Sequence, residues 1–502
     1  MLAYLSAAGE GMLVVFSWPN ILYPVIGTLA AMVTSFLPGA SGITLMALAL
    51  PLTLTWEPQA VVLLFGALVG GATFMGSVTA ILFNVPGGAP NAATLLDGYP
   101  LAMRGQARTA LACAAIASAL GSTIGVVLLV ALLPAVRPIV LAFGPLEFLL
   151  LTAWGLTTII MISHGSVIKG LAMSGFGLVL ALVGLDPVTA EPRWTFGLDY
   201  LADGLGPIPV LLGLFAIAEA LVLMLDRQGQ LQQSGRIADS GSIRAGIGAV
   251  MQHRGLLVRS SLIGTLIGMI PGVGGTVASF VAYGHAVQSS PDKSRFGKGD
   301  VRGIIAPEAS HDAKDGGSLL PVLAFGLPGS EGTVLLVAAL TLHGIVPGKP
   351  MLEQQLPLAF TLIWALFLSN WLTSILGLAV IRPLARLMTL RTDVLAPVIL
   401  ALGAMGAVAS SGRNGDLVVA LAFGVLGYFM LRYGWPRVPF VIAFVLGRML
   451  EDNLLLTIRL VELGRLTPWN RPIAIAIVLL TALSVFWMLR GQRRGAPSAA
   501  VL

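Results

Sequence analysis

The chain alternates long apolar runs with short polar segments over almost its whole length. A helix needs about 20 apolar residues to cross the hydrocarbon core of a membrane, and many of the runs approach or exceed that length. The pattern therefore predicts an all-α polytopic membrane protein with about 11–12 transmembrane helices. The predicted spans are residues 21–37, 58–75, 107–133, 144–162, 165–184, 206–225, 256–270, 357–381, 392–411, 415–431 and 472–489.

Proline–glycine motifs break the apolar sequence at four places, residues 38–42, 84–88, 271–275 and 326–330. Proline lacks an amide donor and glycine permits unusual φ angles, so each motif is expected to end a helix. Inside a bilayer, broken backbone is tolerated only where it is buried in protein or lines a cavity. Five shorter apolar stretches fit half-helices or re-entrant segments, at residues 42–55, 275–287, 317–327, 331–346 and 436–450.

The breaks come in two pairs with similar spacing. Pro271 follows Pro38 by 233 residues (271 − 38), and Pro328 follows Pro86 by 242 (328 − 86). We therefore expect two homologous repeats, and favour inverted ones by analogy with transporters whose half-helices meet at the membrane midplane. The predicted units are repeat one at 1–225, a basic cytoplasmic linker at 226–255, repeat two at 256–450, and a C-terminal span with a basic cytoplasmic tail at 451–502.

Composition agrees with a membrane protein. Hydrophobic residues make up 56% of the 502 and charged residues 10%, whereas soluble domains carry about 25% charged residues. The net charge of +6 comes from basic residues between and beyond the spans, which indicates cytoplasmic loops and no nucleic-acid partner. The sequence has one cysteine, no zinc-ligand spacing, no hydrolase motif and no nucleotide-binding loop, so we expect no metal site, no cofactor, no enzyme and no ATP-driven pump.

The breaks can bind ions through the backbone. The N-terminus of a half-helix offers unpaired amides and a positive dipole end, which suit a carboxylate. Unwound carbonyls and helix C-termini suit a coupling Na⁺ or H⁺. The competing interpretation is that small residues there only let helices pack closely. The predicted substrate-binding residues are Pro38, Gly39, Ser41, Asn84, Pro86, Gly87, Gly88, Pro271, Gly272, Pro328, Gly329 and Ser330.

Four ionisable residues are candidates for coupling or gating: Asp97, Glu308, His311 and Asp312. Asp97 could bind a cation or pair with a nearby arginine, or it could be a helix cap. Glu308, His311 and Asp312 would share one face of a helix. Charges of both signs crowd residues 291–315, so solvated ion pairing is the simpler interpretation for most of them, and a substrate or proton role is the alternative.

The breaks belong to longer motifs that follow one another over roughly residues 20–460. These are LPG at 37–39, GSVTAILFNVPG at 76–87, LDGYP at 96–100, IPG at 270–272, FGKG at 296–299, APEA at 306–309, GLPGS at 326–330, LG at 446–447 and EDN at 451–453. With these motifs the chain resembles the large membrane subunit of the tripartite tricarboxylate transporter family.

The resemblance implies a secondary carrier that imports organic carboxylates across the bacterial inner (plasma) membrane, driven by an ion gradient. It also implies two partners, a small four-span membrane subunit and a periplasmic substrate-binding protein. The chain departs from the family after residues 306–309, where two asparagines are common and His311, Asp312, Lys314 and Asp315 occur here. Because of these departures, the resemblance does not identify which carboxylate is transported or whether the coupling ion is Na⁺ or H⁺.

Two other classes share some of these features. A polytopic membrane enzyme could use Glu308, His311 and Asp312 on a lipid-soluble substrate, but it would have no use for duplicated breaks. A channel could contain re-entrant segments, but its flux would not saturate or require a binding protein. The paired breaks favour the carrier.

Overall fold

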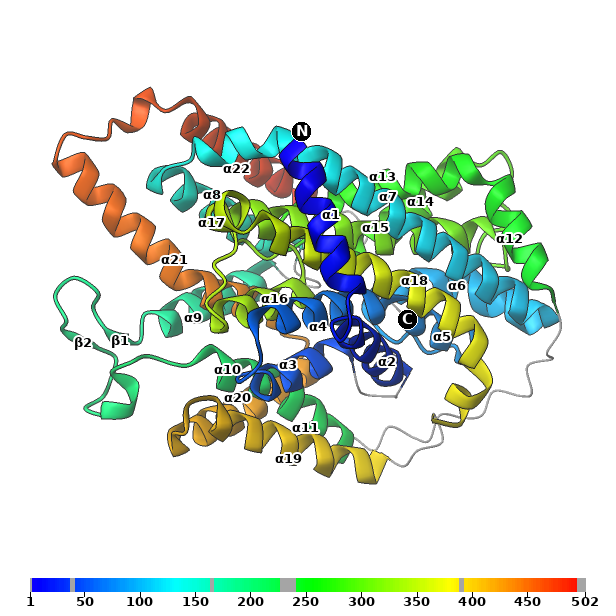
Figure 1. Ribbon diagram of the computed structural model, residues 1–502, viewed down its shortest axis with the longest axis horizontal. Helices are drawn as coiled ribbons and strands as arrows, with labels where there is room; N and C mark the ends of the chain where they lie inside the picture. Colours follow the sequence, from blue (N-terminus) through cyan, green and yellow to red (C-terminus); the bar gives the residue numbers. More distant parts are fainter. Residues whose placement is uncertain (1, 37–40, 163–166, 226–240, 388–391, 494–502) are drawn as a thin grey trace.

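The computed structural model describes residues 2–36, 41–162, 167–225, 241–387 and 392–493, and the described part is almost entirely helical (Figure 1). The strands described are β1 (Gly184–Leu185) and β2 (Pro192–Arg193), a short antiparallel hairpin that projects from one side of the molecule. Within the described residues, 5 helical stretches are long and apolar enough to cross a membrane, and several apolar helices are shorter. The predicted all-α polytopic membrane fold is confirmed.

The first half of the chain, residues 1–225, begins with a helix that the hydrophobic pattern did not single out, α1 (Leu2–Phe16). The other helices of this half follow the apolar runs. They are α2 (Leu22–Phe36), α3 (Gly42–Leu52), α4 (Pro58–Gly71), α5 (Thr73–Phe83), η1 (Ala89–Asn91), α6 (Ala92–Leu101), η2 (Ala102–Gln106), α7 (Ala107–Leu141), α8 (Pro145–Ile162), α9 (Val167–Ala181), η3 (Asp199–Leu201), α10 (Pro207–Leu211), η4 (Leu212–Ile217) and α11 (Ala218–Leu225).

The second half, residues 256–450, contains the most buried helix, α15. Its neighbours in the chain and the C-terminal helices are α12 (Ile243–Gln252), α13 (Arg254–Gly268), α14 (Gly274–Ser289), α15 (Arg302–Phe325), α16 (Glu331–Leu342), α17 (Lys349–Gln354), α18 (Leu356–Leu387), α19 (Thr392–Ser411), α20 (Asn414–Arg432), α21 (Arg437–Glu462), η5 (Pro468–Asn470) and α22 (Pro472–Arg493). Part of the predicted linker, 241–255, is thus largely helical, and residues 226–240 lie outside the described part. The predicted boundary between 450 and 451 falls inside α21, so we move it to the end of that helix.

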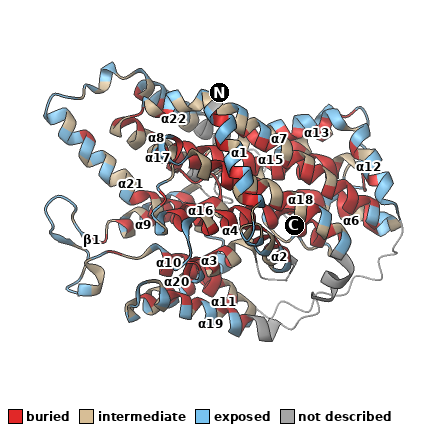
Figure 2. Ribbon diagram, in the orientation of Figure 1, coloured by how far each residue is buried: buried red, intermediate tan, exposed pale blue. Residues whose placement is uncertain are grey.

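Helix α15 lies at the centre of the molecule, between α7, α13 and α14, where Figure 2 shows the ribbon almost entirely buried. Apolar side chains on the peripheral helices are exposed, as expected of surfaces that face lipid. Glycines four residues apart on α7 and α13 let these helices reach the backbone of α15, since a Cβ at any of them would overlap it. The contacts are Gly121 with Ala309, Gly125 with Ala313, Gly264 with Ser310, and Gly268 with Lys314.

The second break of each half has the same local backbone. Helix α5 ends at Asn84 and α15 ends at Gly326, both in the left-handed region at φ 59° and 71°. The next helix begins after Gly88 in one half and Ser330 in the other, both extended at φ −161° and −157°. Each pair is separated by 242 residues, the offset between Pro86 and Pro328. This likeness supports the two-repeat organisation, which remains a prediction.

Candidate functional site

In the first half, the helix before the first break touches the second break. Pro38 and Gly39 lie outside the described residues. The Gly87 N–H donates to the Gly76 carbonyl at 3.1 Å, and a Cβ on Gly87 would lie 3.1 Å from the Ser35 carbonyl oxygen and would overlap Gly76. Glycine is therefore required at position 87 by close packing against α2 and α5.

In the second half the two breaks also touch. Pro271 and Gly272 form the turn between α13 and α14, and the Gly272 N–H donates to the Gly329 carbonyl at 3.2 Å. Gly272 has φ 78°, which favours glycine. A Cβ on Gly329 would lie 2.9 Å from Ser318 Cβ, so position 329 also has no room for a side chain.

Half-helices that follow the breaks of one half pack against those of the other. Helix α14 contacts η1, and α3 contacts α16. A Cβ on Gly275, in the first turn of α14, would lie 3.3 Å from Pro90 Cγ and 2.8 Å from His311 Cδ2. The broken segments of both halves therefore lie against one another.

Two of the predicted hydroxyls act as helix caps. Ser41 Oγ accepts from the Thr44 N–H at 3.2 Å at the start of α3. Ser330 forms a capping box with Thr333 at the start of α16, where the Ser330 N–H donates to Thr333 Oγ1 at 2.7 Å. These bonds fix where each half-helix begins and use part of the hydrogen-bonding capacity of both serines. Their predicted contact with substrate stays a prediction.

Glu308 reaches the first half from α15. Its Oε1 accepts from Ser77 Oγ of α5 at 2.6 Å and from Thr94 Oγ1 of α6. The Asn91 side-chain amide donates to Ser77 Oγ at 2.8 Å and to the Thr73 carbonyl at 3.1 Å, which ties η1 to α5. Glu308 Oε2 is buried and has no hydrogen-bond partner among the described residues. The glutamate thus contacts the helices that flank the break at residues 84–88.

The charges that follow Glu308 on α15 are buried as well. Asp312 Oδ2 accepts from Ser118 of α7, while Asp312 Oδ1 and His311 Nδ1 have no hydrogen-bond partner among the residues that the structure describes. Lys314 forms an ion pair with Asp315, and Asp315 also accepts from Thr73 Oγ1 at 3.4 Å. Solvated ion pairing is therefore wrong for this part of residues 291–315, because the glycines of α7 and α13 bring those helices onto α15 and exclude water.

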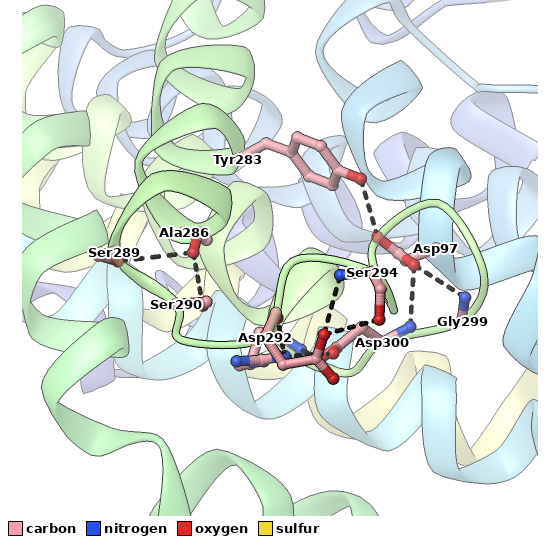
Figure 3. Close-up of polar contacts among 10 residues, drawn as sticks. Asp97, Tyr283, Ala286, Ser289, Ser290, Asp292, Ser294, Gly299 and Asp300 are labelled. Carbon is pink, nitrogen blue, oxygen red and sulfur yellow. Dashed lines mark hydrogen bonds and ion pairs between the residues drawn. The ribbon is translucent and has the colours of Figure 1, made fainter.

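Asp97 takes part in a different arrangement, which neither of its two interpretations anticipated. It is fully buried in α6, where Oδ1 accepts the N–H groups of Gly299 and Asp300, each at 2.8 Å, and Oδ2 accepts the Tyr283 hydroxyl at 3.0 Å (Figure 3). Asp97 therefore fastens the loop between α14 and α15 to α6. A coupling or gating role for Asp97 stays a prediction.

The Asp300 side chain ties the same end of this loop to the first residue of α15. It accepts from the Arg302 N–H at 2.9 Å and from Arg302 Nη2 at 2.6 Å. Burial by itself would raise the pKa of the Asp300 carboxyl, but these bonds outweigh it and hold the pKa below its ordinary value. The loop is therefore fixed by an ionised carboxylate at neutral pH.

Ser118, Lys314 and Asp315 belong to the buried cluster and were not selected from the sequence. A serine within an apolar run and two charges beside a Gly-Gly pair were the available signals. A further charge in an apolar run, Glu219, pairs with Arg437 at 3.1 Å between α11 and α21, away from the breaks. An apolar cavity of about 170 Å³ lies between α3 and α19, and none of its lining residues carries a charge.

Comparison with known proteins gives two kinds of match. The model of the tripartite tricarboxylate transporter TctA family matches residues 21–442. An uncharacterized 52.8 kDa protein in the TAR-I ttuC' 3' region of Agrobacterium vitis is 31% identical over 435 residues, which cover 87% of this chain and 86% of that protein. A second Agrobacterium vitis protein, in the TAR-II ttuC' 3' region, is 31% identical over 191 residues, which cover 38% of this chain and 79% of that protein. No solved structure matches.

Proposed function

The chain belongs to the tripartite tricarboxylate transporter TctA family, and from this premise we propose that it is the large transmembrane subunit of a secondary transporter that imports organic carboxylates. Its partners in this proposal are a small four-span membrane subunit and a periplasmic binding protein that delivers the substrate. The membrane is the bacterial inner membrane, and an ion gradient drives uptake because the sequence has no nucleotide-binding loop.

The observation that carries the proposal is the meeting of the broken segments. The Gly272 N–H bonds to the Gly329 carbonyl in one half, and Gly87 packs against Ser35 and Gly76 in the other. The first turn of α14 lies against Pro90 of the other half. Helix starts from both halves thus lie against one another, and in our proposal their backbone amides and positive dipole ends attract a carboxylate without a basic side chain.

The neighbouring side chains suit a carboxylate substrate. Ser77, Thr94 and Asn91 are buried hydrogen-bond donors on the elements that flank the break at residues 84–88. Substrate binding would draw on the backbone amide of Gly88 and on these side chains once they leave their present acceptors, since the Gly87 N–H already donates to the Gly76 carbonyl. Discontinuous helices that meet near the midplane are the usual place for substrate and coupling ion in secondary transporters.

Reconstitution tests the proposal. Proteoliposomes that contain this chain, the small subunit and the binding protein should accumulate labelled carboxylate when an Na⁺ or H⁺ gradient is imposed, and should not do so without the binding protein. The same vesicles with both gradients collapsed should accumulate nothing when ATP is supplied. Accumulation driven by ATP alone, or flux that does not saturate and needs no binding protein, would contradict a secondary carrier.

A further inference from the structure

The interior of α15 contains more acid than base. Glu308, Asp312 and Asp315 are each no more than 1% exposed, and Lys314 is 7% exposed. Lys314 forms its ion pair with Asp315. Among the described residues, this pairing leaves Glu308 and Asp312 hydrogen-bonded to neutral hydroxyls, which include those of Ser77, Thr94 and Ser118. An unpaired carboxylate inside a membrane protein is costly, so each of these two needs a cation or a proton.

Each of the two carboxyls has one occupied and one unoccupied oxygen. Glu308 Oε2 and Asp312 Oδ1 are buried and have no hydrogen-bond partner within the described part of the chain, while the second oxygen of each accepts from a hydroxyl. A protonated carboxyl has one donor oxygen and one acceptor oxygen, so this pattern offers a place for one proton on each residue. His311 lies on the same face of the helix, and its Nδ1 is also buried without a partner.

The carboxyl and imidazole side chains of α15 do not form a metal site by themselves. Among the described residues, no group of three or more histidine, cysteine, aspartate or glutamate side chains is placed to hold a metal ion. Glu308 is held by α5 and α6, whereas Asp312 is held by α7, so their oxygens are drawn to different helices. A hard metal cation needs several oxygen ligands that converge on one point. The Lys314 ammonium already supplies the fixed positive charge of the cluster.

The charged groups that act on Asp312 are Asp315, Glu308 and Lys314, and the one that acts on His311 is Lys314. Helices α4 and α5 contribute no titratable side chain to the surroundings of α15. Among the side chains that the structure describes, the other helices packed against α15 carry Asp97 and Tyr99 on α6, Arg108, Cys113 and Arg137 on α7, Arg254 and Arg259 on α13, Tyr283 and His285 on α14, Glu331 on α16, and Lys349 and Glu353 on α17.

The fold itself does not require these charges. At the 242-residue offset, Glu308, Asp312 and Asp315 correspond to Gly66, Gly70 and Thr73 of the first half (308 − 66, 312 − 70, 315 − 73). Gly66 and Gly70 pack closely against α18. Small neutral residues are what a buried helix usually presents to its neighbours. A charged cluster in one half alone therefore indicates a task that the other half does not share.

We propose that the coupling ion of this transporter is the proton, that Glu308 and Asp312 on α15 bind and release it, and that His311 connects these carboxyls to the breaks. The inference rests on the transport function proposed above. His311 provides the connection because its ring packs against Gly275 in the first turn of α14. A Cβ added to this glycine would lie 2.8 Å from His311 Cδ2. Each carboxylate takes up one proton from the outside, becomes neutral, and gives the same proton to the inside when substrate leaves.

The test uses the complete reconstituted complex. Labelled carboxylate accumulation is measured under an inward H⁺ gradient without Na⁺ and under an inward Na⁺ gradient with the H⁺ gradient collapsed. We expect accumulation under the first condition and none under the second. Substrate addition under weak buffering should also make the external medium more alkaline, which a pH dye reports for the unmodified protein and therefore independently of any variant.

Variants locate the site. Glu308→Gln and Asp312→Asn should lose accumulation driven by H⁺ but retain exchange of labelled for unlabelled substrate, which moves no net proton. Glu353→Gln, an exposed carboxylate on α17, is the matched control and should behave like the unmodified chain. Accumulation driven by Na⁺ alone, or unchanged proton-driven accumulation in the Glu308→Gln, Asp312→Asn double variant, would overturn this inference. Neither result would contradict the proposed transport function. Failure of both accumulation and exchange in the unmodified complex would instead overturn the proposed function.

Discussion

Thr73 of α5 donates a hydrogen bond to Asp315 of α15 at 3.4 Å, and the two residues are separated by 242 positions, the offset between Pro86 and Pro328. Residues that correspond in two related halves can touch only near the axis that relates those halves, since away from it each contacts a different element. The contact therefore supports a pseudo-two-fold relation between the halves, with the axis passing between α5 and α15.

Glycine at positions 87 and 329 should be indispensable for uptake. Gly87→Val would force Gly76 or Ser35 aside, and Gly329→Val would meet Ser318, with an overpacking cost of about 1–3 kcal/mol at each site. We expect uptake to be lost while membrane insertion persists, measured by substrate uptake and by the amount of protein in the membrane fraction. Gly284→Val is the matched control, because a Cβ there meets nothing within 4 Å. Wild-type uptake by either variant would place that turn away from the substrate.

Asp97 should stabilise the loop between α14 and α15. Asp97→Asn replaces one carboxylate oxygen with an amide donor, which mismatches at least one of the bonds from Gly299, Asp300 and Tyr283 at a cost of about 1–3 kcal/mol. We expect faster amide hydrogen exchange over residues 290–301 and little change elsewhere. Asp292→Asn, at an exposed position of the same loop, is the control. Equal exchange rates in the two variants would show that Asp97 does not hold the loop.

The same loop should loosen in acid. The pKa of Asp300 is lower in the folded protein than its ordinary value, so the stabilisation is fully present above about pH 4 and is lost as the pH falls through the folded value. Hydrogen exchange of residues 290–301, corrected for its intrinsic pH dependence, should therefore show a loss of protection at low pH in the unmodified chain. Asp300→Asn should remove this acid transition, and an unchanged transition in that variant would assign it to another group.

His311 and Asp312 are both buried on α15, and the His311 ring lies against Gly275 in the first turn of α14. Changing both to asparagine should alter the ranking of carboxylate substrates or flatten the pH dependence of uptake between about pH 5 and 8, where histidine ordinarily titrates. Competition by mono-, di- and tricarboxylates at two pH values, measured on the exchange of labelled for unlabelled substrate that Asp312→Asn should retain, reports both effects. Identical rankings and identical pH profiles would show that these residues take no part in transport.

Much of the fold follows from local signals in the sequence. The length of an apolar run indicates a span whatever lies beside it, and the proline–glycine motifs end helices by removing an amide donor and permitting a left-handed residue. The helix ends at Asn84 and Gly326 fall where these motifs predict them. Ser77, Thr94 and Asn91 were recognisable as hydrogen-bonding groups near a break, because polar side chains are few in that run.

The tertiary structure alone decided which charges are buried. Residues 308–315 have the composition of a solvated segment, and no local pattern distinguishes a charged helix in water from one enclosed by other helices. The enclosure comes from glycines on α7 and α13, which lie far from α15 in the sequence and matter only once the three helices meet. In the same way, the sequence around Asp97 indicates a helix cap or a gating residue. Only the fold, which places the loop at residues 290–301 beside α6, shows that Asp97 accepts hydrogen bonds from that loop. Sequence determines such side chains' chemistry, while long-range packing determines their solvent and partners.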